Sequence, residues 1–137
     1  MAYLWNSIFE TGNEEIDDQH KQLFKTLNDI AGAFANGIGS EEICKTLDFL
    51  SEYTIKHFKT EEELMRKYNY PEYNMHKMCH EDFKLTVEDF VRQLKKDGPS
   101  EDMILNVTVT IGEWLTTHIR IDDIKMSKYI ESKEFDD

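Results

Sequence analysis

The stretch of sequence that decides the fold is residues 43–68, ICKTLDFLSEYTIKHFKTEEELMRKY. Within it, mostly apolar residues recur at alternating steps of four and three positions, which is the spacing of one face of an α-helix. These positions are Ile43, Leu47, Leu50, Thr54, His57, Glu61, Leu64 and Tyr68. A long helix with one such face needs partners to cover that face, so this segment predicts a packed helical domain.

Three further segments, at residues 17–34, 73–94 and 104–118, show the same helical period. Turn-forming residues follow the first of them at Asn36-Gly37 and the second at Asp97-Gly98-Pro99. The chain contains only 6 Gly and 2 Pro, which favours long helices with short connections over a many-stranded sheet. The sequence therefore predicts an all-α protein, an up-down-up-down antiparallel four-helix bundle.

We expect the 137 residues to form one domain. Its expected parts are an irregular N-terminal arm at residues 1–16, the bundle at residues 17–120 and a C-terminal tail at residues 121–137. We expect Asp17 or Asp18 to cap the first helix, because Asp side chains accept hydrogen bonds from the backbone amides that open a helix. The tail is expected to contain a short C-terminal helix from Ile121 to Ile130.

The net charge of -12, from 28 acidic and 16 basic residues, bears on the partners of the protein. An acidic chain repels phosphate backbones and anionic membrane surfaces, so we expect no nucleic-acid partner and no membrane partner. No stretch approaches the roughly 20 apolar residues of a membrane span, and the N-terminus does not resemble a secretory signal. Cys44 and Cys79 both fall in helical patterns, which is typical of reduced thiols, and we expect a cytoplasmic location.

All five histidines of the chain fall on the apolar faces of the predicted helices: His20, His57, His76, His80 and His118. A single histidine on such a face is usually a hydrogen-bonded core residue, but five out of five are too many for independent accidents. Glu61 shares the face of His57, where an unpaired carboxylate carries a large desolvation cost. In an antiparallel bundle the histidine positions lie at the same end, so we expect them to converge on one metal site.

The ligand set indicates the kind and the number of metal ions. Imidazole and carboxylate suit iron, zinc, copper or nickel, and the absence of thiolate ligands argues against an iron–sulfur cluster. Five histidines, Glu61 and one aspartate near His118 are too many for one tetrahedral zinc ion, which takes about four ligands. Two six-coordinate ions that share both carboxylates and a bridging oxygen from solvent fit better, and they leave a single position open for a small molecule.

Four short motifs resemble the hemerythrin signature: IDDQH at 16–20, HFKTE at 57–61, HKMCH at 76–80 and HIRIDD at 118–123. The resemblance runs from Trp5 to Asp123 and is closest to the single-domain bacterial members of that family. It implies two iron ions, Fe2+ or Fe3+, joined by a bridging oxo or hydroxo group. The implied ligands are His76, His80 and His118 for one iron, His20 and His57 for the other, and Glu61 and Asp123 as bridges. The motif spacing selects Asp123 rather than Asp122 as the second bridge.

The resemblance also implies a function, which is reversible binding of dioxygen at the open position of the iron held by His20 and His57. The protein would then be an oxygen carrier, store or scavenger. The same site also suits sensing of oxygen, nitric oxide or redox state, or iron buffering, and these alternatives stay open. By resemblance, the wall of the oxygen pocket consists of Leu23, Phe58, Trp114, Leu115 and Ile119. Each of these residues equally suits an ordinary bundle core.

Two enzymatic alternatives conflict with the sequence. A ferritin-type di-iron oxidase needs a Glu-x-x-His pair on each of two helices, and no histidine here has a glutamate three positions before it. A zinc peptidase needs a general-base glutamate where the motif at 76–80 has Lys77. We therefore expect no enzymatic activity. As partners we expect dioxygen and, as a candidate recipient, a downstream oxygen-consuming enzyme, and we expect the chain itself to be a monomer.

Overall fold

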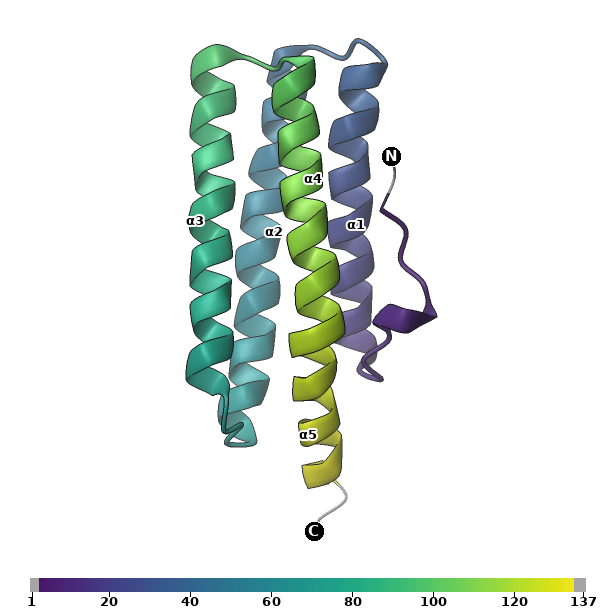
Figure 1. The fold of residues 1–137 in the computed structure, drawn as a ribbon, viewed down its shortest axis with the longest axis vertical. Coiled ribbons are helices and arrows are strands. Elements are labelled where there is room, and N and C mark those ends of the chain that lie inside the picture. The colour runs from purple at the N-terminus through teal and green to yellow at the C-terminus, as the bar shows by residue number, and fades with distance from the viewer. Residues whose placement is uncertain (1–2, 135–137) are drawn as a thin grey trace.

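The computed structural model describes residues 3–134, and within them helices are the only regular secondary structure. Four long helices form an antiparallel bundle, and a short fifth helix continues the fourth (Figure 1). Their bounds are α1 (Glu14–Ala35), α2 (Ser40–Lys67), α3 (Tyr73–Asp97), α4 (Glu101–His118) and α5 (Ile124–Glu134). Two short turns, η1 (Ser7–Phe9) and η2 (Ile119–Asp123), lie in the N-terminal arm and between α4 and α5. Each long helix contacts its chain neighbours and α1 contacts α4, so the predicted up-down-up-down four-helix bundle is confirmed.

The first helix starts earlier than predicted. Its N-cap is Asn13, whose side chain accepts a hydrogen bond from the amide of Ile16 at 3.1 Å. The prediction of Asp17 or Asp18 as the cap is wrong, and the arm therefore ends before residue 14 rather than at residue 16. Asp17 instead accepts hydrogen bonds from the backbone amide of Thr11 at 3.0 Å and from its hydroxyl at 2.7 Å. These bonds tie the arm to α1.

The C-terminal tail also differs from the prediction. Helix α4 continues directly into η2, a π-helical turn, and the short C-terminal helix α5 begins at Ile124 rather than at Ile121. In η2 the amide of Ile124 donates to the carbonyl of Ile119, five residues earlier. Residues 1–2 of the predicted arm and residues 135–137 of the predicted tail lie outside the described part of the chain.

Two apolar clusters fill the bundle, and a polar layer separates them. The larger cluster includes Leu23, Phe58, Phe83, Leu115 and Ile119. The smaller cluster consists of Ile16, Met65, Tyr70, Met126 and Ile130. The histidine and carboxylate positions fall between the two along each helix, so that apolar side chains shield the polar layer on both sides. No helix within residues 3–134 is both long and apolar enough to cross a membrane.

The N-terminal arm lies alongside α1 (Figure 1). The amide of Tyr3 donates to the side-chain oxygen of Asn28 at 2.9 Å, and the side-chain amide of Asn28 donates to the carbonyl of Tyr3 at 2.7 Å. Further along the arm, the ring of Phe9 packs against Phe24 with 5.4 Å between the ring centroids. Turn η1 also contacts η2. The arm is therefore anchored on the bundle at both of its ends.

Candidate metal centre

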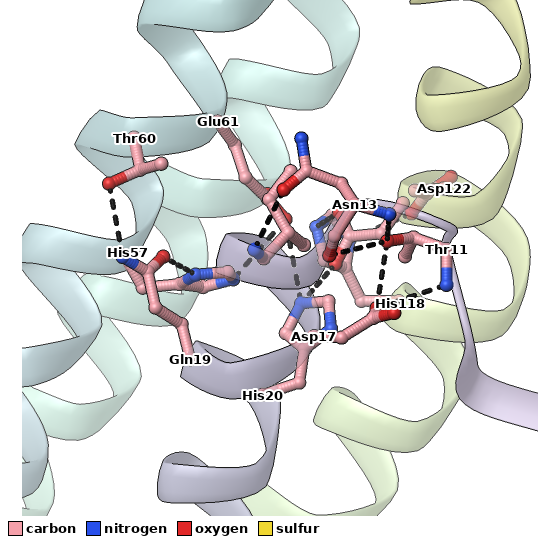
Figure 2. A network of polar contacts seen from close by, with 12 residues as sticks. Thr11, Asn13, Asp17, Gln19, His20, His57, Thr60, Glu61, His118 and Asp122 are labelled. Carbon is pink, nitrogen blue, oxygen red and sulfur yellow. Dashed lines mark hydrogen bonds and ion pairs between the residues drawn. The ribbon is translucent and has the colours of Figure 1, made fainter. Parts of the chain in front are cut away.

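The seven side chains predicted as metal ligands lie together in the polar layer: His20, His57, Glu61, His76, His80, His118 and Asp123. All of them are buried, with no more than 4% of any residue exposed. Figure 2 shows His20, His57 and Glu61, which come from α1 and α2, pointing toward one another. The structure therefore brings together every residue that the sequence analysis named as a ligand.

The histidines form a two-histidine group (His20 and His57) and a three-histidine group (His76, His80 and His118), and Glu61 faces both. Oε2 of Glu61 lies 3.5 Å from Nε2 of His20 and 3.2 Å from Nε2 of His57. Oε1 of Glu61 lies 3.4 Å from Nε2 of His76 and 3.0 Å from Nε2 of His80. One carboxylate oxygen therefore faces each group.

Asp123 divides its oxygens in the same way. Oδ2 of Asp123 lies 3.0 Å from Nε2 of His20, in the two-histidine group. Oδ1 lies 3.1 Å from Nε2 of His76 and 3.2 Å from Nε2 of His118, in the three-histidine group. With two carboxylates that each offer one oxygen to each group, the layer can hold two cations side by side and bridge them.

The π-helical turn η2 explains how His118 and Asp123 both reach the centre. Successive residues of an α-helix are rotated by about 100°, so residues five apart point about 140° away from each other. A π-helical turn closes its hydrogen bonds over five residues, so residues five apart lie on the same side of the helix. The spacing of His118 and Asp123 therefore suits η2 and not a regular α-helix.

The charges in the layer favour bound cations. Burial lowers the pKa of His20 and His76, but the adjacent carboxylates of Asp123 and Glu61 outweigh burial and raise both pKa values to about 9. Burial likewise lowers the pKa of His118, and the adjacent carboxylates outweigh it and raise that pKa well above its ordinary value. Burial alone would raise the pKa of Glu61, yet the surrounding imidazoles hold it well below its ordinary value. The buried carboxylates therefore need positive charge beside them, from protons or from metal ions.

Several buried polar atoms of the layer have no hydrogen-bond partner within residues 3–134. They are both ring nitrogens of His20, Nε2 of His57, Oε2 of Glu61 and both carboxylate oxygens of Asp123. An unpartnered buried polar group costs about 1–3 kcal/mol, so such a concentration of them indicates a ligand. The ligand atoms form two overlapping sets, one for each histidine group, within which all atoms lie within 4.8 Å of one another. Nitrogen and oxygen donors of this kind fit two iron ions.

Three residues outside the predicted ligand set accept hydrogen bonds from Nδ1, the ring nitrogen that faces away from the centre, of three histidines. Nδ1 of His57 lies 2.7 Å from Oε1 of Gln19, Nδ1 of His80 lies 2.8 Å from Oε2 of Glu62, and Nδ1 of His118 lies 2.8 Å from Oδ2 of Asp122. Each of these partners is the chain neighbour of a predicted ligand, and that adjacency is the signal that the sequence offered. Because Nδ1 donates to its partner, Nε2 is the nitrogen that can direct a lone pair at an ion in the centre.

The residues predicted to wall the oxygen pocket are Leu23, Phe58, Trp114, Leu115 and Ile119, and they pack in or against the larger apolar cluster. All except Trp114 are at most 2% exposed. The ring of Phe58 stacks on His80 with 3.7 Å between ring centroids. The ring of Trp114 stacks on His118 with 4.3 Å between ring centroids. These two aromatic rings therefore lie against the three-histidine group.

The fold and the layer together define a class of protein, a helical bundle with a buried histidine–carboxylate cluster able to hold metal. The model of the family described as Hemerythrin, with its HHE cation binding domain, matches residues 11–130. The chain belongs to the hemerythrin family. This family binds dioxygen at a di-iron centre, and its members are generally non-enzymatic oxygen binders.

Individual relatives agree with the family match. A hemerythrin-like protein of Naegleria gruberi is 35% identical over 121 residues, which cover 88% of this chain and 87% of that protein. A myohemerythrin of Theromyzon tessulatum is 32% identical, over 90% of this chain and 89% of its own length. A bacteriohemerythrin of Pseudomonas aeruginosa is 32% identical, over 90% of this chain and 78% of its own length. A crystal structure of wild-type hemerythrin superposes with a TM-score of 0.83 at 29% identity, covering 93% of this chain and 96% of that one.

Proposed function

We propose that this protein holds two iron ions in its polar layer and binds dioxygen reversibly there, as an oxygen carrier, store or scavenger. The proposed ligands are His76, His80 and His118 for one ion, His20 and His57 for the other, and Glu61 and Asp123 as bridges. The observation that carries the proposal is the division of each carboxylate between the two histidine groups. Each ion position then has its own histidines and one oxygen from each bridge.

The two positions are unequal, and the difference indicates where dioxygen binds. One group supplies three imidazoles, and the group of His20 and His57 supplies two. The two-histidine position therefore has one protein ligand fewer and has room for a small molecule. When bound, iron supplies the electrons that dioxygen takes up and returns on release. The part of the protein is to hold the ligands in place and to shield them from water.

Shielding follows from the apolar residues next to the layer. Leu23, Leu115 and Ile119 are at most 2% exposed and belong to the same continuous core. None of the five proposed pocket residues carries an acidic or basic side chain, so they offer no proton to a bound molecule. Exclusion of water and protons suppresses side reactions in a buried site. This environment supports reversible binding rather than turnover of a substrate.

The test is the iron content of the purified protein together with its absorption spectrum before reduction, after reduction and after re-oxygenation. We expect two irons per chain and oxo-to-iron absorption bands that disappear when oxygen is removed and return with it. Two irons with immediate irreversible oxidation would favour a sensor or an enzyme over a carrier. One ion or none in the fully loaded protein would overturn the proposal.

A matched pair of variants tests the bridging role of Glu61. Glu61→Gln keeps the size of the side chain but removes the charge that faces both groups, so we expect fewer than two irons per chain and no reversible bands. Glu63→Gln makes the same change at an exposed position of the same helix, and it should leave the iron content and the bands unchanged. Equal iron content in the two variants would contradict the bridging role.

A further inference from the structure

The outer partners of the histidines differ in charge between the two groups. For two histidines of the three-histidine group the outer partner is a carboxylate: Nδ1 of His80 donates to Glu62 and Nδ1 of His118 donates to Asp122, each at 2.8 Å. A carboxylate only accepts hydrogen bonds, so the hydrogen lies on Nδ1 in both rings. Two negatively charged side chains therefore contact the histidines of this ion position, on the side that faces away from the ion.

In the two-histidine group the outer partner is a neutral amide, Gln19, whose Oε1 lies 2.7 Å from Nδ1 of His57. The orientation of this amide is fixed by its other end, because Nε2 of Gln19 donates to the hydroxyl of Thr60 at 3.3 Å. That hydroxyl in turn donates to the carbonyl of Lys56 and is left as an acceptor for Gln19. Nδ1 of His20 has no hydrogen-bond partner within residues 3–134. One neutral group therefore stands behind this position.

This difference in charge bears directly on metal affinity. An imidazole that donates to a carboxylate is a stronger metal ligand than one that donates to a neutral amide, and the carboxylate adds attraction for the cation. The bridges contribute equally to both positions, because Glu61 and Asp123 each give one oxygen to each group. The outer partners are therefore what distinguishes the two positions, besides the number of histidines.

We propose that Glu62 and Asp122 make the three-histidine position the tighter of the two, so that it fills with metal first, whereas Gln19 keeps the two-histidine position weaker. The inference rests on the proposed two-ion centre and adds an order of loading to it. Glu62 should contribute more than Asp122, because the side chain of Glu62 is 10% exposed while that of Asp122 is 39% exposed and screened by water. All three are positioning residues, since they act through the histidines that they contact.

Stepwise binding of Zn2+ to the metal-free protein, measured by calorimetry and chelator competition, tests this order. For the wild type we expect two binding steps. His118→Ala should remove the tighter step, and His57→Ala should remove the weaker step. Glu62→Gln should weaken the tighter step by about 10- to 100-fold, the usual effect of losing a residue that supports a metal-binding histidine, and spare the weaker step. Glu63→Gln, the same change at an exposed neighbour, should alter neither step.

Gln19→Glu makes the reverse change, from a neutral amide to a carboxylate, at the two-histidine position. It places a carboxylate behind His57, so the weaker step should tighten by about tenfold, and a gain in affinity cannot arise from misfolding. Unchanged steps in both Glu62→Gln and Gln19→Glu would overturn the inference, and so would equal weakening of both steps in Glu62→Gln. A wild type that binds one Zn2+ or none would instead overturn the proposed function.

Discussion

Gly32 and Gly112 both lie inside helices, but a methyl group added at the two positions meets different surroundings. At Gly32 the new Cβ would have no heavy atom within 4 Å. At Gly112 it would lie 2.7 Å from Cδ2 of the Tyr3 ring and closer still to Cε2 and Cζ, a separation that real Cβ atoms do not show. Gly112→Ala therefore tests whether the Tyr3 ring of the N-terminal arm packs on α4. Gly32→Ala is its matched control.

The expected changes in the free energy of unfolding differ between the two positions. Replacement of a helix-interior glycine by alanine stabilises a protein by about 1 kcal/mol, and Gly32→Ala should show this gain in full. In Gly112→Ala the ring of Tyr3 must move, which disrupts the hydrogen bond from its hydroxyl to Glu113, whereas the two hydrogen bonds with Asn28 are made by the backbone of Tyr3 and stay in place. One hydrogen bond contributes about 1 kcal/mol, so the loss offsets the gain and leaves the stability nearly unchanged.

Thermal unfolding of the variants measures these values. For a chain of this size, 1 kcal/mol shifts Tm by about 3–5 °C, so Gly32→Ala should raise Tm by about 4 °C and Gly112→Ala should leave it nearly unchanged. A double-mutant cycle with Tyr3→Ala isolates the contact. Once the Tyr3 ring is gone, Gly112→Ala should stabilise the protein by about 1 kcal/mol, as Gly32→Ala does.

Two results would refute this reasoning. One is stabilisation of the wild type by Gly112→Ala as large as that by Gly32→Ala. The other is an equal effect of Gly112→Ala with and without the Tyr3 ring. Either result would mean that the ring does not rest on α4. The packing of the arm on the bundle matters for the metal centre, because turn η1 of the arm contacts η2, the segment that carries Asp123.

Three further predictions concern the centre and its surroundings. Chelation should lower Tm in calorimetry, because an ion at 100 times its dissociation constant stabilises the fold by about 2.7 kcal/mol; an unchanged Tm would contradict bound metal. Leu115→Asp should admit water and speed the decay of the oxygenated spectrum, whereas exposed Leu105→Asp should not; equal decay would remove Leu115 from the pocket. Burial and Glu72 raise the pKa of Tyr70 to about 12, so its contribution to stability is present below pH 10 and lost as the pH rises toward 12. The metal-free Tyr70→Phe variant should not show this loss of stability between pH 10 and pH 12. Alkaline unfolding profiles that are identical for the variant and the metal-free wild type would contradict the prediction.

The helices could be predicted because their apolar faces are long and regular, as the agreement between the pattern at 43–68 and helix α2 shows. The start of α1 could not be predicted in the same way. Asn13, Asp17 and Asp18 are all good capping residues, and local preference does not choose among them. The position of the cap depends on a contact with the arm. Thr11 donates two hydrogen bonds to the carboxylate of Asp17, and Asn13 caps the helix instead.

The convergence of the histidines could also be predicted, because helical period and antiparallel order place them at one end of the bundle. Their outer partners could not, because a polar residue beside a ligand points either to the neighbouring helix or to water. Glu62 reaches across to His80 on α3, whereas the next residue, Glu63, is exposed. Both are glutamates in the same helical turn, and only the packing of α3 against α2 separates their roles.

The two aspartates that follow His118 show what spacing alone leaves open. In a regular α-helix Asp122 lies one turn after His118, whereas Asp123 points about 140° away from it. With the π-helical turn η2 both carboxylates reach the same imidazole: Oδ2 of Asp122 lies 2.8 Å from Nδ1, and Oδ1 of Asp123 lies 3.2 Å from Nε2. The choice between Asp122 and Asp123 is therefore a division of roles, in which Asp122 orients the ring from outside and Asp123 faces the centre. Both roles depend on the wider turn, because a regular helix would withdraw Asp123 from the layer.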